Sequence, residues 1–287
     1  MKVWQNGKWT IYPDRQDKII EGNDKMSLNI RDNLAAKSVE VEKKNETLTV
    51  EFEVLKTFTK PYGFEEKLIR FRGSDTRYKA ITKNKQLVAI LGRFYQLIPN
   101  EDVEDKVRTL AAKDNMEIQI IPQDWRLYAL LKSNDVGVMV SNSVDGTTAL
   151  RCDAILYNNG NIIMPSFKHL KNIYKKHSKE LNIKDLDKEI DEIFKISKKY
   201  KEWFESLDNV KVEPYLNPLR EMFKTIPQKY IHGVLEGYYF NNSMSLKQVY
   251  EKLSSRIWQE DTDIRTKITL FRKINDCLAA IGVVDML

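Results

Sequence analysis

Apolar and polar residues alternate along much of the chain before residue 165. In Thr47–Phe58, apolar side chains at every second position are separated by threonines and glutamates, which predicts a strand with one buried face. Asn100 can cap a helix that runs to about Lys113, because acidic residues occupy its first turn. A β-β-β-α order is therefore expected from three strand-like segments and this helix: Lys67–Arg72, Arg77–Thr82, Gln86–Leu97 and Asn100–Lys113.

The chain begins with a segment typical of a β-hairpin. Asn6-Gly7 supplies the two residues that a tight type I′ turn requires. Pairing Gln5 with Lys8 then places Trp4 opposite Trp9 on one face of the hairpin. This tryptophan pair can either pack against the body of the fold or form a platform for stacking or subunit contact.

A second group of short strands follows, without helices between them. Turn residues such as Asp145-Gly146 separate its members, which favours antiparallel pairing. The predicted strands are Met116–Ile121, Trp125–Leu131, Val136–Ser141 and Thr148–Tyr157.

After residue 165 the apolar spacing changes to steps of three and four. Ser166 can cap a helix with a seam from Phe167 to Leu181, and a second seam follows over Lys184–Leu207, so an antiparallel helical hairpin is expected. Further helices are predicted from Pro218, from Leu246 with Ser245 and Gln248 as a capping box, and over Asp263–Ile281. The predicted fold is α+β, with an antiparallel sheet domain over residues 1–165 and a helical domain over residues 166–287.

Composition excludes several classes of protein. The 287 residues include 42% hydrophobic and 31% charged residues, as in soluble globular proteins, with no apolar run of the ~18–20 residues that cross a membrane. The amino terminus lacks the apolar segment of a secretory signal, and two isolated cysteines indicate reduced core thiols, so a cytoplasmic location is expected. Three scattered histidines and the absence of phosphate-binding glycine motifs predict neither a metal nor another cofactor.

The positive charge of the chain is concentrated in one segment. The net charge is +6, yet residues 56–93 alone hold ten Lys and Arg against three Asp and Glu, a local charge of +7. Alternate residues on a strand share a face, so Arg70 and Arg72 project together, as do Arg77 and Lys79. A cationic sheet with nearby rings suits single-stranded nucleic acid, although an ordinary solvated sheet face has the same pattern. The candidate phosphate contacts are Arg70, Arg72, Arg77, Lys79, Lys83, Lys85 and Arg93, and the candidate stacking rings are Tyr78 and Tyr95.

No catalytic residue is predicted. Asp145 is explained by its turn with Gly146, and Cys152 alternates with apolar residues as a core thiol does. No GxSxG motif occurs. The candidate acids Asp124, Asp135, Asp145 and Asp153 are not arranged as a close acidic pair followed by a basic residue, which a metal site would favour. A metal-dependent nuclease stays open as an alternative, because carboxylates far apart in sequence can converge in space.

Two stretches resemble a family of phage- and plasmid-borne proteins of poorly defined function. Residues 78–101, which include Phe94-Tyr95-Gln96-Leu97-Ile98-Pro99-Asn100-Glu101, are similar to the family's strand ending in "Y-x-x-V/I-x-N-E". Residues 141–149 resemble its "N-S-H-D-G-S-x-A" segment, with Val144 in place of the histidine. The β-β-β-α order and basic sheet are also similar to RecT-, Redβ- and Erf-like annealing proteins. This second resemblance implies rings or filaments of subunits that hold one DNA strand without ATP.

The leading hypothesis is therefore a non-catalytic, oligomeric single-stranded DNA-binding and annealing protein of a phage, plasmid or virus, with RNA left open as a ligand. It would act in recombination or replication in the cytoplasm, of the host cell if viral. Reversing the charges of Arg72 and Lys79 should then abolish binding without unfolding the protein. The alternative is a structural or assembly protein of a virus or mobile element.

Overall fold

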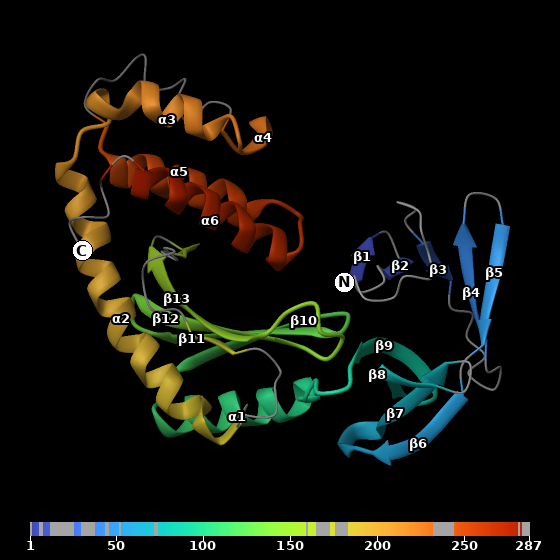
Figure 1. The fold of residues 1–287 in the computed structure, drawn as a ribbon. Coiled ribbons are helices and arrows are strands. Elements are labelled where there is room, and N and C mark those ends of the chain that lie inside the picture. Colours follow the sequence, from blue (N-terminus) through green and yellow to red (C-terminus); the bar gives the residue numbers. More distant parts are fainter. Residues whose placement is uncertain are drawn as a thin grey trace. The chain divides into compact units, whose positions relative to one another are not determined.

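The computed structural model describes residues 2–5, 8–11, 26–29, 38–43, 46–51, 53–71, 74–158, 160–164, 173–175, 183–231, 244–280 and 282. The chain divides into two compact units. The N-terminal unit comprises residues 1–99 and 144–146, and the C-terminal unit comprises residues 100–143 and 147–287. Figure 1 shows the elements of both units along the chain.

The first sheet of the N-terminal unit contains five antiparallel strands in sequence order. They are β1 (Lys2–Gln5), β2 (Lys8–Ile11), β3 (Met26–Asn29), β4 (Ser38–Lys43) and β5 (Glu46–Glu51). The predicted hairpin register is confirmed, because Trp4 pairs with Trp9 and Gln5 with Lys8. The Asn6-Gly7 turn itself lies outside the described residues.

A second antiparallel sheet follows, with four strands in sequence order. Its strands are β6 (Glu53–Thr59), β7 (Phe64–Phe71), β8 (Ser74–Lys83) and β9 (Gln86–Gly92), with a 3-10 turn η1 (Pro61–Gly63) after β6. The single strand expected over Thr47–Phe58 is wrong, because this segment contributes β5 to one sheet and β6 to another. Alternation continues across the break, so periodicity alone cannot reveal a change of sheet. Strand β9 ends before Leu97 because a turn begins at Gly92, whose carbonyl oxygen accepts from the Tyr95 amide at 2.9 Å.

The C-terminal unit begins with the predicted helix, α1 (Asn100–Lys113). The predicted strands are confirmed as antiparallel neighbours, joined by a short fifth strand. They are β10 (Glu117–Gln123), β11 (Arg126–Ser133), β12 (Val136–Ser143), β13 (Leu150–Asn158) and β14 (Asn161–Ile163).

The prediction of a helix after Ser166, the first of the expected helical hairpin, is wrong for the residues of it that the structure describes. Ile173–Lys175 forms a strand, β15, that pairs antiparallel with Leu150–Cys152 of β13. Strand β14 pairs only with Leu156–Asn158 of β13, so the first residues of β13 have no partner in β14 and can pair with β15. This pairing outweighs the local helical spacing of the segment. The rest of the predicted helix, with Ser166 and His177, lies outside the described residues.

The second predicted helix is confirmed as α2 (Leu186–Ser206), and its expected seam is buried along its whole length. The Ser245–Gln248 capping box is also confirmed at the start of α5 (Leu246–Gln259), whereas the helix predicted from Pro218 begins at Leu216. The remaining elements are η2 (Ile183–Asp185), η3 (Leu207–Asn209), η4 (Glu213–Tyr215), α3 (Leu216–Phe223), α4 (Gln228–Ile231) and α6 (Ile264–Ala280).

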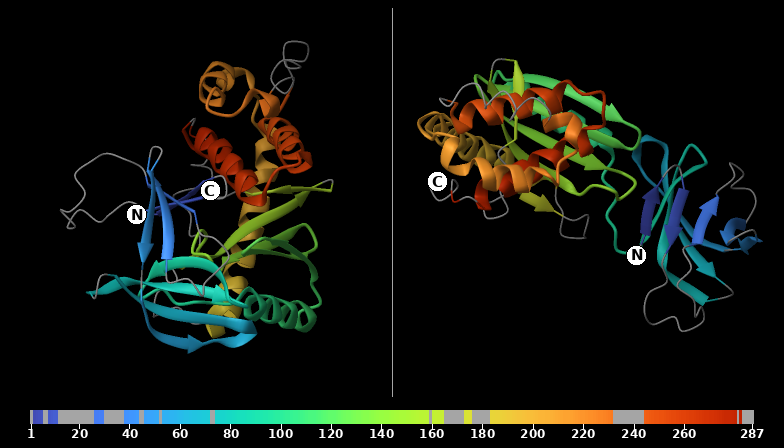
Figure 2. Two further views of the ribbon diagram at one scale, coloured as in Figure 1. Left: turned by 90° about the vertical axis from the view of Figure 1, so that its right-hand side faces the viewer. Right: turned by 90° about the horizontal axis from the view of Figure 1, so that it is seen from above.

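Helices cover both faces of the sheet in the C-terminal unit. In Figures 1 and 2, α1 and α2 lie against one face, and α5 and α6 lie over the other. Strand β12 is therefore buried at every position, without the alternation of a half-exposed strand. This packing corrects the boundary expected at residue 165: the sheet and its covering helices form one unit, and the division falls between Pro99 and Asn100. Among the described helices, none is both long enough and apolar enough to span a membrane.

Gly137 of β12 has no space for a side chain beside the neighbouring strands β11 and β13. A Cβ atom there would lie 2.3 Å from the Leu131 carbonyl oxygen and 2.9 Å from the Tyr157 ring. The Ser197 hydroxyl on α2 also donates to the Gly137 carbonyl at 2.9 Å. We expect Gly137→Ala to lower the free energy of unfolding by about 1–3 kcal/mol through overpacking, measured by urea denaturation. Gly92→Ala is the control, because a Cβ at Gly92 meets no atom within 4 Å; equal effects of the two substitutions would contradict this account.

Candidate nucleic-acid interface

The register of the β6–β9 sheet gathers cations on one of its faces. Lys56 pairs with Leu68, and Leu68 with Lys79, so these three side chains share a face. Alternation along each strand adds further cations, because every second residue projects to the same side. We call this surface the cationic face, and its members are Lys56, Lys60, Arg70, Arg77, Lys79 and Lys83. The predicted same-face placement of Arg77 and Lys79 agrees with this register, whereas Arg72 lies outside the described residues.

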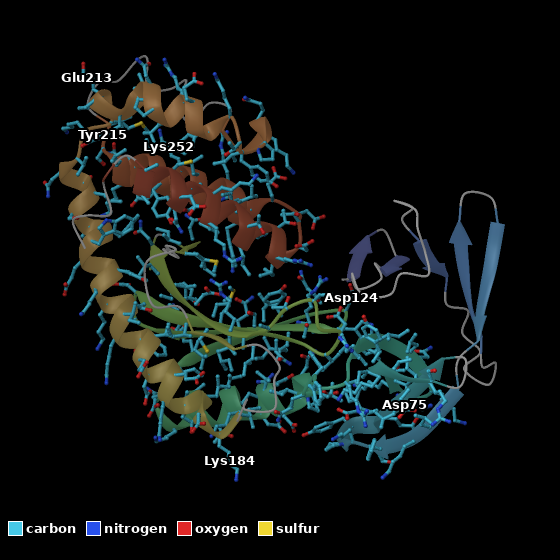
Figure 3. All side chains as sticks on the ribbon, viewed as in Figure 1. Asp75, Asp124, Lys184, Glu213, Tyr215 and Lys252 are labelled. Atoms are coloured by element: carbon cyan, nitrogen blue, oxygen red, sulfur yellow. The ribbon has the colours of Figure 1, made fainter. Side chains whose placement is uncertain are left out.

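Each acidic side chain of residues 56–93 has a basic partner. Lys67 lies 2.9 Å from Glu65, Lys79 lies 2.9 Å from Glu66, and Arg70 lies 3.0 Å from Asp75, which Figure 3 labels. The hydrogen bond from Lys67 is the main cause that lowers the pKa of Glu65. Glu66 also lies 3.9 Å from Lys60. The described residues of 56–93 hold nine Lys and Arg against three acids, so a net charge of +6 is left on this segment.

Lys79 is not available to a ligand, which corrects its assignment as a phosphate contact. Its residue is only 4% exposed, and its ammonium group is paired with the partly buried Glu66. A lysine is rarely buried unless it is paired, and this pair accounts for its burial. Lys79 therefore stabilises the sheet.

The other predicted cations lie nearer to solvent. Arg77 and Arg93 are exposed, and the Arg93 amide donates to the Arg77 carbonyl oxygen at 2.7 Å, which brings the two residues together. The Lys83 ammonium group lies 4.6 Å from the centre of the Phe64 ring. Lys85 is exposed in the β8–β9 turn, where Asn84 and Lys85 have φ of 50° and 69°. Two positive φ values are typical of a tight hairpin turn.

The two tyrosines predicted as stacking rings do not lie open on this face. Tyr78 pairs with Gly92 and projects to the face opposite Lys79. Tyr95 is partly buried against the 144–146 loop, where the Gly146 backbone hydrogen-bonds its hydroxyl; burial and the charge of Asp145 raise its pKa well above the usual range. Tyr95 therefore anchors this loop.

Three exposed rings, Phe58, Tyr62 and Phe94, were not among the predicted stacking rings. Phe58 of β6 is 37% exposed and belongs to the cationic face, where it pairs with Glu66 in the β6–β7 register. Phe94 is 68% exposed in the turn after β9. The alternation Lys56-Phe58-Lys60 was a usable signal for the first ring, since its three members must share one side of an extended strand.

The two stretches that carry the family resemblance contact each other within each unit. In the N-terminal unit, Tyr95 meets Asp145 and Gly146, and Gly146 has the positive φ of the predicted turn. In the C-terminal unit, the buried Asn142 amide donates to the Asn100 side-chain oxygen at 2.8 Å. These polar residues therefore have structural contacts that need no ligand.

The other candidate acids are dispersed. Asp135 at the β11–β12 turn pairs with Lys201, whose hydrogen bond lowers the pKa of Asp135. Asp153 is buried against Arg151, and Asp124 occupies a turn. Both Cys152 and Cys277 are buried free thiols. Within the described ranges, no group of three or more His, Cys, Asp or Glu side chains is placed to hold a metal ion.

Comparisons with known proteins found no match for this chain. No family model matches the chain, and neither a curated protein nor a solved structure matches it. The resemblances suggested by the sequence stay predictions.

Proposed function

We propose that this protein binds single-stranded DNA along the cationic face and anneals complementary strands without ATP. The observation that carries the proposal is the charge arrangement of the β6–β9 sheet. The three acids of residues 56–93 form ion pairs with Lys67, Lys79 and Arg70, and the described residues of this segment keep a net charge of +6, which attracts a polyanion. Lysine and arginine side chains that neutralise phosphates release counterions, which favours binding independently of base sequence.

The arrangement supports an extended strand as the ligand. Lys56 lies in the middle of β6 and Lys60 directly follows its last residue, whereas Arg77 lies on β8, so phosphate contacts would be distributed across the sheet. Alternate residues on one strand are separated by about 6.6–6.8 Å, which lets successive cations follow a flexible backbone. Annealing requires only that the base-pairing edges of a bound strand stay accessible. A surface that contacts the phosphates leaves these edges accessible.

Charge reversal of two exposed cations tests the proposal. We expect Lys56→Glu with Arg77→Glu to weaken binding of a labelled oligonucleotide at least about tenfold at ~50 mM salt. The slope of log affinity against log salt should become less steep by about 1.4, because each lost phosphate contact on a single strand removes about 0.7. Fluorescence anisotropy over a salt series measures both quantities, and a quenched-pair assay measures annealing.

Lys195→Glu with Lys198→Glu is the matched control. Both lysines are exposed on α2, and the double substitution changes the net charge by the same amount at another surface. Equal losses in the two variants would show that only net charge matters and would contradict a site on β6–β9. Wild-type protein that fails to bind, or that cleaves the strand in Mg²⁺ or Mn²⁺, would also contradict the proposed function.

A protein-contact role is the second candidate, favoured by exposed apolar side chains on the same edge strand. Val54 and Leu55 are 45% and 40% exposed, although a buried face was expected for this segment. Exposed edge strands can pair with another chain. An assembly protein would self-associate or capture a protein partner and ignore oligonucleotides, so the anisotropy measurement separates the two candidates.

A further inference from the structure

We infer that Phe58, flanked by Lys56 and Lys60, forms a stacking site for an unpaired base. This inference rests on the proposed function and deepens it, because it selects single strands over duplexes as the ligand. The three residues alternate on the β6 side of the sheet, so the ring and both ammonium groups project to one face.

The surroundings of the ring leave it accessible. Phe58 is 37% exposed on β6, which is an edge of the four-stranded sheet. The Lys56 ammonium group lies 4.9 Å from the ring centre, as in a cation–π contact. Phe58 is the second-last residue of β6, and its exposed ring lacks the burial that is usual for a phenylalanine. Its cationic neighbours do not suit an apolar protein partner.

The chemistry of this arrangement matches a nucleotide with an unpaired base. The two lysines attract the phosphates on either side, and the ring offers an apolar surface to a base. Such stacking tolerates any sequence, because every base has a π-face. A duplex keeps its bases stacked on each other, so it would gain only the phosphate contacts.

The test compares a thymidine oligonucleotide with an abasic strand of the same length and phosphate count. Wild-type protein should bind the thymidine strand more tightly than the abasic strand. Phe58→Ala should lower affinity for the thymidine strand about 5- to 150-fold, the range for loss of one stacked base, and leave affinity for the abasic strand unchanged. Phe58→Trp should restore the preference, whereas Phe58→Leu, apolar but not aromatic, should not.

Other results overturn the inference in distinguishable ways. If wild type binds both strands equally, phosphate binding stands and the stacking site is wrong. If Phe58→Leu behaves as wild type, the residue has only a packing role. If Phe58→Ala changes sedimentation but not the ratio of affinities, Phe58 contacts another protein chain. If wild type binds neither strand, the proposed function fails and the stacking site fails with it.

Discussion

Lys79→Ala is expected to destabilise the β6–β9 sheet by about 3–5 kcal/mol, because it leaves the Glu66 carboxylate without its main partner in a partly buried site. The Lys79 and Glu66 side chains are only 6% and 12% exposed, so solvent replaces little of the lost interaction. Lys60 lies 3.9 Å from Glu66 and can compensate in part, which places the effect toward the lower end of that range. Hydrogen exchange of β7 and β8 amides measures the loss, with α2 amides as an internal reference.

The double variant Lys79→Met with Glu66→Leu provides the control. Replacing both members of a buried pair by apolar residues of similar size is often neutral, so protection should return close to wild type. This variant also retains the net charge, and its affinity for single strands should stay within about twofold of wild type because Lys79 is not a phosphate contact. Lost affinity in the folded double variant would contradict the structural role assigned to Lys79.

The charge reversal suggested by the sequence alone would therefore give a misleading result. Reversing Arg72 and Lys79 was expected to abolish binding without unfolding, yet a glutamate at residue 79 would face Glu66 within the sheet. Two carboxylates at that distance repel each other strongly. Loss of binding by such a variant would report unfolding, and this is why exposed Lys56 and Arg77 carry the functional test.

Local patterns predicted an element well where its apolar residues form one continuous row along one face. The apolar row of α2 and the Ser245–Gln248 capping box could be predicted, because both depend on residues three or four positions apart. Local patterns could not predict the break between β5 and β6 or the strand at Ile173–Lys175. Both depend on which open sheet edge a segment meets, and sequence periodicity contains no information about that partner.

The candidate site is still a prediction, but the structure revises its composition. Charge counting selected residues 56–93, and alternation placed Arg77 and Lys79 on one face, as they lie along β8. The pairing of Glu66 with Lys79 could not be predicted, because it depends on the β7–β8 register, which sets which side chains meet across the strands. The same register and the 144–146 loop determine which rings are open, and for this reason Phe58 replaces Tyr78 and Tyr95 as the stacking candidate.

Removal of Arg151 is expected to have the second large effect on stability. The Asp153 side chain is fully buried, and the Arg151 Nε donates to its two carboxylate oxygens at 2.6 and 2.5 Å. Arg151→Met would leave a carboxylate in the interior without its partner, at a cost of about 3–5 kcal/mol in the free energy of unfolding. Asp153→Asn should cost less, because the Arg151 side chain is 13% exposed and can turn toward water. Urea denaturation of the two variants measures this asymmetry.

The double variant distinguishes a buried charge from ordinary packing. If the pair mattered only through the volume it fills, Arg151→Met would still cost more than Asp153→Asn, because asparagine keeps the size and shape of aspartate. The order of the two single variants therefore has to be measured together with a variant that removes both charges. Arg151→Met combined with Asp153→Leu should recover most of the lost stability, because no charge then remains at the site. Failure of this double variant to recover would assign the loss to packing beneath α2 instead.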